Sequence, residues 1–193
     1  MGKYRYGKPD EEISLDTFKQ KLEASGLSQR KKAYLILLYW LGCRKSEPLV
    51  LKKEDLELKD NNLYVSINYR RNKDGEIILF SRAKRGQAGG PSELNLNLYG
   101  VPLVVEVWRR TKRNRKVFGF SDDTGYRAVQ KLFPRKTPHH FRYNRITKLR
   151  KKLGDTLTID EIKSFTGIRR DTTIQDYGLK TRAGIHKVAQ QLD

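Results

Sequence analysis

The feature that most constrains the fold is the apolar run at residues 34–41, Tyr-Leu-Ile-Leu-Leu-Tyr-Trp-Leu. Apolar side chains on nearly every side predict a helix buried in the core, because a surface helix keeps one polar face. Ser28 is placed to open this helix, and Gly42 ends it. The charged segment Arg44-Lys45-Ser46-Glu47-Pro48 follows at once. We therefore expect a central helix with charged residues just beyond its C-terminal end.

The region before this helix predicts another helix. Ser14 is a suitable N-cap, Leu15, Phe18 and Leu22 recur on one helical face, and Gly26 is a suitable end. The middle of the chain instead predicts a small sheet. Alternating strands are expected at 63–67, 76–80 and 93–98, with a glycine turn at 72–75 and a basic, glycine-rich loop at 81–91.

The C-terminal half again predicts helices. They are expected to begin near Pro102, Thr124, His139, Thr158 and Lys180. The clearest start is Thr158-Ile159-Asp160-Glu161, a capping box in which each end residue can bond the backbone of the other. We expect the helix from Thr124 to run through Leu132, and the helix from His139 to end at Gly154.

These elements predict a mainly α-helical α+β domain with a three-stranded antiparallel sheet. We expect residues 1–12 to form a flexible basic arm and residues 13–193 to form one domain, because no linker or internal repeat separates its parts.

The charge of the chain points to a polyanionic partner. It has 41 lysines and arginines against 22 acidic residues, a formal net charge of +19. Nucleic acid is the leading partner class, and a basic ribosomal component is the plainer alternative. An anionic membrane is the rival, but no apolar run reaches spanning length, and no signal or lipidation pattern is present. We expect no membrane association.

Cysteine and histidine usage bears on the compartment and on metals. Cys43 is the sole cysteine, so no internal disulfide can form, and a reducing, intracellular compartment is expected. The three histidines are not spaced as a zinc site. We therefore expect Cys43 to be a small packed side chain, and no structural metal.

Four residue types in the chain suit phosphate chemistry, although each alone has an ordinary explanation. Arg44 could cap helix carbonyls, His139 could be a half-buried core histidine, and Tyr177 could be a packing residue. Lys84 lies among many lysines. Arginine forks nevertheless match phosphate oxygens, histidine transfers protons near neutral pH, and tyrosine can act as a nucleophile.

Taken together and in order, these motifs resemble the catalytic domain of the tyrosine recombinases, the phage-integrase and Xer-like family. The resemblance is carried by Gly42-Cys43-Arg44-Lys45-Ser46-Glu47, by His139-His140-Phe141-Arg142, and by Tyr177 ten residues after Gly167. It covers residues 13–193. The family motifs are Gly-x-Arg-x-Ser-Glu, a lysine in a β-hairpin, His-x-x-Arg and the tyrosine.

The resemblance implies a DNA strand transferase without metal or other cofactor. Arg44 and Arg142 would clamp the scissile phosphate, and Tyr177 would form a 3′-phosphotyrosyl link that conserves the phosphodiester energy. Lys84 would protonate the leaving 5′-oxygen, and His139 would help move the tyrosine proton.

Further residues have supporting roles under the same resemblance. Glu47 would orient its neighbours. Lys73 is the alternative to Lys84, and either lysine could instead be a simple phosphate contact. We also expect DNA-backbone contacts from a set of basic residues: Lys45, Arg82, Arg85, Arg145 and Lys148.

The sequence departs from the family in two ways. Ile168 stands where the family has histidine or tryptophan, and isoleucine cannot donate a hydrogen bond to phosphate. His140, Arg169 or Arg170 would have to supply that donor, or the site is slower. The separate N-terminal domain of the family also has no counterpart, so the chain is expected to be either an excised fragment or a minimal enzyme.

The partners implied are double-stranded DNA and further copies of the chain. We expect a tetramer on DNA and a monomer or weak oligomer without it, in the cytoplasm, the nucleoid or a virus-infected cell, with a mobile element as one setting. The helix from Lys180 would pack either on a neighbouring subunit or on its own core. Two alternatives remain open: a type IB topoisomerase-like enzyme, and a DNA-binding module without catalysis.

Overall fold

The computed structural model describes residues 12–71, 74, 76–79, 91–152 and 156–166. The α-helices in these ranges are α1 (Leu15–Ala24), α2 (Gln29–Leu41), α3 (Glu47–Val50), α4 (Val101–Arg109), α5 (Asp122–Leu132), α6 (Pro138–Arg150) and α7 (Ile159–Thr166). A turn of 3-10 helix covers Lys53–Asp55. The strands are β1 (Leu56–Lys59), β2 (Asn62–Val65), β3 (Tyr69–Arg71), β4 (Ile77–Leu79) and β5 (Ser92–Asn95). This confirms the predicted mainly helical α+β fold.

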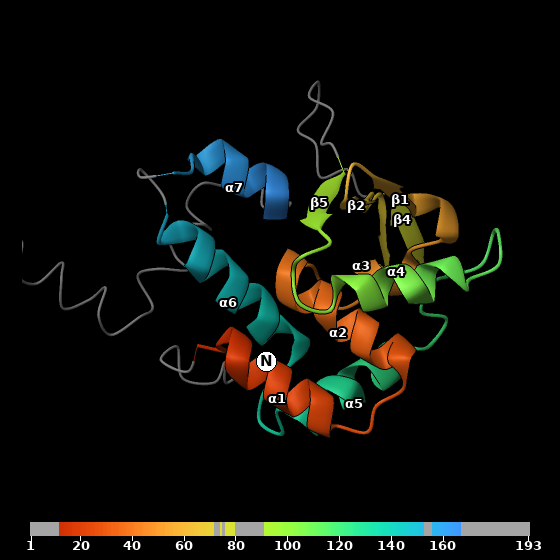
Figure 1. The fold of residues 1–193 in the computed structure, drawn as a ribbon, viewed down its shortest axis with the longest axis horizontal. Coiled ribbons are helices and arrows are strands. Elements are labelled where there is room, and N and C mark those ends of the chain that lie inside the picture. The colour runs from red at the N-terminus through yellow and green to blue at the C-terminus, as the bar shows by residue number, and fades with distance from the viewer. Residues whose placement is uncertain (1–11, 72–73, 75, 80–90, 153–155, 167–193) are drawn as a thin grey trace, which may run out of the picture.

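Helix α2 is the central element, as its sequence predicts. Eight of its thirteen residues are buried, among them Tyr34 and the four residues that follow it. The helix contacts α3, α4, α5 and α6, and Figure 1 shows these helices around it, with the strands grouped beyond α3 and α4. A helix that is apolar on all sides needs such neighbours on every side. Cys43, just after the helix, is fully buried as expected.

The predicted three-stranded antiparallel sheet is present, but one of its strands differs from the prediction. The sheet has the order β1-β2-β5, while β3 and β4 pair in a separate two-stranded sheet. The expected pairing of strands 63–67 and 76–80 is therefore wrong. Strand β1 was missed because its turn is Asp60-Asn61 and contains no glycine. Both turn residues have positive φ, 47° and 61°, which Asp and Asn tolerate better than other non-glycine residues.

The predicted helix boundaries are mostly close, and two need correction. Helix α5 begins at Asp122 and is capped by Ser121 rather than by Thr124, because the Ser121 hydroxyl accepts the Thr124 N–H at 3.2 Å. Helix α6 begins one residue before His139, with Pro138 in its first turn, and ends at Arg150. The expected end at Gly154 is therefore too late, because Lys151 and Lys152 already form a turn in which the Lys152 N–H donates to the Leu149 carbonyl, three residues back.

The predicted capping box at the start of α7 is confirmed. The Thr158 N–H donates to Glu161 Oε2 at 2.7 Å, and the Glu161 N–H donates to Thr158 Oγ1 at 3.2 Å. These bonds hold the pKa of Glu161 below its usual value, because they favour the charged carboxylate. Within the described ranges, no helix combines the length and apolar character that crossing a membrane requires.

Candidate active site

The candidate site is built where the C-terminal end of α2 meets α6. Gly42 ends α2 in the left-handed conformation, φ 55° and ψ 29°, and its N–H donates to the Leu38 carbonyl at 3.0 Å. A Cβ at Gly42 would lie 2.8 Å from Arg145 Cβ, a side-chain atom of α6. Glycine is therefore required here twice over, for its backbone angles and for the close approach of α6.

Arg44 lies just beyond this point and is held by Glu47. Its Nη1 donates to Glu47 Oε1 at 2.8 Å, and its backbone N–H donates to Glu47 Oε2 at 2.9 Å. The Glu47 side chain is fully buried, whereas the Arg44 side chain is 36% exposed. A buried carboxylate thus fixes both the backbone and the guanidinium of an arginine that still reaches solvent. This geometry fits the orienting role predicted for Glu47.

Arg142 comes to the same place from α6. It is buried, with Nη1 donating to the Gly42 carbonyl at 2.8 Å and Nη2 donating to the Thr166 carbonyl at 2.9 Å. Its guanidinium therefore joins the end of α2 to the end of α7. Gly42 is two residues before Arg44, and two residues of chain span at most about 7 Å. The Gly42 carbonyl that accepts from Arg142 therefore lies close to Arg44.

The two histidines at the start of α6 differ in what they do. His139 is exposed and lies three residues before Arg142, which places both on the same side of the helix. His140 instead caps the helix, because its Nδ1 accepts the Thr137 N–H at 2.9 Å. A neutral His140 ring then carries its proton on Nε2. Of the two, His139 is the one placed at the surface of the candidate site.

Arg145 lies between aromatic rings rather than on an open surface. Its guanidinium carbon is 5.9 Å from the centre of the Trp40 ring and 5.3 Å from that of Phe165. Its Nε is buried without a hydrogen-bond partner in the described part of the chain. Burial lowers the pKa of Arg145 from its usual value. Arg145 thus ties α2, α6 and α7 together, and the DNA contact predicted for it would require it to leave these rings.

The other basic residues predicted to contact DNA are in different settings. The Lys45 side chain is 52% exposed and lies 3.7 Å from Asp122. Lys148 is partly buried, donates to the Ile13 carbonyl and the Tyr39 hydroxyl, both at 3.3 Å, and pairs with Glu12. Lys45 is therefore open to a phosphate, whereas Lys148 is bound to the segment that precedes α1.

The remaining predicted residues lie outside the described residues. These are Lys73, Arg82, Lys84, Arg85, Ile168, Arg169, Arg170 and Tyr177. Their roles stay predictions.

Several contributors to the site were missed in the sequence. The carbonyls of Gly42 and Thr166 bind Arg142, and Trp40 and Phe165 enclose Arg145. A sequence does not show which backbone carbonyls accept hydrogen bonds from distant side chains. Trp40 is near the end of the central apolar run, so the sequence indicates an aromatic ring there. Phe165 is more than a hundred residues further along, so the sequence does not indicate that the two rings lie on either side of Arg145.

Comparison with known proteins gives matches among solved structures. No protein-family model matches the chain, and no curated protein does. The structure is similar to that of XerA recombinase, with a TM-score of 0.61 and 18% identity over 99% of this chain and 66% of the other. It is similar to the Tn1549 transposon integrase in complex with transposon right end DNA, with a TM-score of 0.61 and 15% identity over 100% of this chain and 68% of the other.

A third match is the XerH site-specific recombinase bound to its palindromic difH substrate. The TM-score is 0.59 and the identity 16%, over 94% of this chain and 53% of the other. The chain thus spans about two thirds of the first two matched chains and about half of the XerH chain. Its fold is that of these recombinases and integrases, the tyrosine recombinase catalytic-domain fold predicted from the sequence.

Proposed function

We propose that this chain is the catalytic domain of a site-specific tyrosine recombinase. It would cleave and rejoin double-stranded DNA through a 3′-phosphotyrosyl link to Tyr177. The observation that carries the proposal is the bond from Arg142 to the Gly42 carbonyl, two residues before Arg44. Two arginines 98 residues apart in the sequence are thereby brought to one region, in a fold whose solved examples include recombinases bound to DNA.

The arginine pair supplies the positive charge that the reaction needs. When an oxygen attacks a phosphodiester, charge builds on the non-bridging oxygens, and guanidinium groups held in advance can offset it. Arg44 is held by Glu47 and still reaches solvent. The two carbonyls that accept from Arg142 are neutral, so these bonds orient its guanidinium and leave its positive charge in place.

The remaining steps are assigned to residues that complete the site. Tyr177 attacks phosphorus, the bond to the 5′-oxygen breaks, and Lys84 gives that oxygen a proton. His139, exposed near the start of α6, takes up the tyrosine proton. Rejoining reverses these steps, because the phosphotyrosyl link conserves the phosphodiester. In this scheme the charges of arginine and lysine serve where other enzymes use a metal ion, and no cofactor takes part.

The proposal extends to the partners of the chain. The net charge of +19 supports a polyanionic substrate. Strand exchange joins two DNA duplexes, so we infer that four copies assemble on DNA and that the chain is a monomer or weak oligomer without it. The proposed setting is inside a cell, in the cytoplasm, the nucleoid or a virus-infected cell.

The test is covalent capture of DNA. A substrate nicked close to the cleavage point loses its short 5′-hydroxyl fragment after attack, so the protein stays attached to the 3′ end. We expect the wild-type protein to form this adduct and Tyr177→Phe to form none. Tyr126→Phe is the matched control, because Tyr126 is an exposed tyrosine on α5 and its variant should react normally. An adduct with Tyr177→Phe, or none with the wild type on any of a panel of sequences, would contradict the proposal.

A further inference from the structure

A pocket lies at the end of α2 opposite the candidate active site. It has a volume of about 310 Å³ and lies between the turn that joins α1 to α2 and one face of α5. A helix of thirteen residues is about 20 Å long. The pocket is therefore about 20 Å from Gly42 and separate from the arginine pair.

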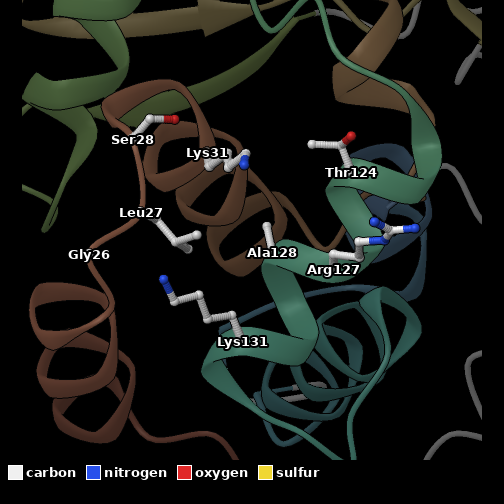
Figure 2. A pocket seen from close by; sticks show the side chains of 8 residues that line it. All are labelled: Gly26, Leu27, Ser28, Lys31, Thr124, Arg127, Ala128 and Lys131. Carbon is white, nitrogen blue, oxygen red and sulfur yellow. The ribbon is translucent and has the colours of Figure 1, made fainter.

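Basic side chains from two elements line this pocket, and no acidic side chain does. Its lining residues are Gly26, Leu27, Ser28, Lys31, Thr124, Arg127, Ala128 and Lys131. Figure 2 shows Lys31 of α2 and Lys131 of α5 on opposite sides of the pocket, with Leu27 and Ala128 between them. Arg127 extends away from the pocket and pairs with Asp123 at 2.8 Å.

The two lysines lack acidic partners in the described part of the chain, where neither ammonium group forms an ion pair. Two like charges that line one pocket repel, and an anion between them reduces that repulsion. The α2 side of the pocket favours an anion for a second reason. The first turn of α2 contains Arg30 and Lys31 and no acidic residue, and the Ser28 side chain makes no capping bond. Cations at this end of a helix are unfavourable, and an anion is favourable.

We propose that this pocket binds a phosphate group, held by Lys31 and Lys131. Lysine binds phosphate as a compact point charge with three donors, and two ammonium groups on opposite walls can approach different oxygens of one phosphate. The aliphatic walls of Leu27 and Ala128 leave room for part of the molecule that carries the phosphate. The phosphate can belong to a small phosphate compound or to a DNA backbone, and the two sources are separated by experiment. The proposal does not depend on recombinase activity.

The test compares two double variants with the same loss of charge. Lys31→Gln/Lys131→Gln removes both ammonium groups of the pocket. Lys59→Gln/Lys112→Gln is the control, because both lysines are exposed and neither lines the pocket. Lys59, Lys112 and Lys131 are exposed and Lys31 is partly exposed, so both variants should fold, which melting curves without ligand check. The pocket variant should melt at or slightly above the wild-type temperature, because its two cations no longer repel each other. Two titrations follow at constant ionic strength, one calorimetric with inorganic pyrophosphate and one by fluorescence anisotropy with duplex DNA.

Saturable pyrophosphate binding that is at least about tenfold weaker in the pocket variant than in the control supports a small-phosphate site, since tenfold corresponds to one lost charged contact. If pyrophosphate does not distinguish the variants but DNA binding does, the DNA backbone is the source. Repeated at several salt concentrations, the DNA titration should then show that the pocket variant releases up to about two fewer counterions on binding than the control variant does. Equal behaviour of the two variants toward both ligands would overturn the proposal.

Discussion

Replacement of Gly42 by alanine tests the close contact on which the candidate site is built. Gly42 has φ 55°, and an added Cβ would lie 2.8 Å from Arg145 Cβ and 3.0 Å from Arg145 Cγ. These atoms are near the backbone of α6, so they cannot swing aside as the end of a long side chain can. We expect the variant to be less stable than the wild type for two separate reasons: alanine is strained at this φ, and its Cβ would crowd α6.

The magnitude follows from those two reasons. An alanine with left-handed backbone angles costs about 1–2 kcal/mol, less about 0.4–1 kcal/mol gained because alanine restricts the unfolded chain. Overpacking against α6 adds about 1–3 kcal/mol. The expected loss for Gly42→Ala is therefore about 1–4.5 kcal/mol in the free energy of unfolding, measured by equilibrium denaturation in urea. The same change should slow covalent capture of DNA, because the Gly42 carbonyl holds Arg142.

Gly119→Ala is the matched control. Gly119 has nearly the same φ, 59°, but the nearest atom to an added Cβ is the Lys116 carbonyl oxygen at 3.9 Å, an ordinary contact. Only the backbone effect remains, so the expected loss is between zero and about 1.5 kcal/mol. If Gly42→Ala and Gly119→Ala lose the same free energy, α6 does not press on Gly42, and the described geometry of the site is wrong.

Three further predictions concern charge. Glu47→Gln should lower the free energy of unfolding by about 1–3 kcal/mol, because the buried acceptor of two Arg44 bonds loses its charge. Denaturation should show this loss, and single-turnover capture of DNA should be slower. An unchanged free energy of unfolding together with an unchanged capture rate would contradict the role of Glu47. The pKa of Glu12 is lowered chiefly by its bond to Lys151, so its stabilisation is present above the unfolded pKa and is lost as pH falls through the lower folded value. Since Glu12 is partly exposed, Glu12→Gln should be less stable than the wild type by under about 1 kcal/mol at pH 7. The two proteins should be equally stable near pH 2. A difference in stability that persists near pH 2 would refute the stabilising role of the Glu12 carboxylate. DNA affinity should fall linearly on logarithmic axes as salt rises. A flat line between roughly 50 and 300 mM, over which the Debye length shortens about 2.4-fold, would exclude a phosphate-dominated surface.

The fold was predictable where local signals and burial agree. The apolar run after Ser28 predicted α2 and its central place, and Thr158 with Glu161 predicted the start of α7. The sheet was less predictable, because strand pairing depends on contacts between distant residues. The turn predicted at residues 72–75 suggested that the strand expected at 76–80 pairs with β2. Instead, β2 pairs with β1 across Asp60-Asn61.

The candidate site was predictable as a set of residues but not as a set of contacts. Motif order pointed to Arg44, His139 and Arg142, whereas the separate uses of His139 and His140 depend on the capping bond to Thr137. The setting of Arg145 was not predictable, because its rings come from two other helices. An arginine on a basic chain was expected to face DNA, and the structure encloses it between Trp40 and Phe165 instead.

The most direct test of the central claim is covalent capture with a substrate whose scissile phosphate is replaced by a neutral methylphosphonate. If Arg44 offsets charge on that phosphate, Arg44→Ala should lose most of its rate on ordinary DNA and much less, relative to the wild type, on the neutral substrate. Arg44→Ala removes the guanidinium that pairs with the buried Glu47 carboxylate, but both substrates are tested with the same protein, so a loss of stability affects the two rates alike. An equal fractional loss on both substrates would mean that Arg44 does not act on the charge of the phosphate, and the proposed arginine clamp would be wrong.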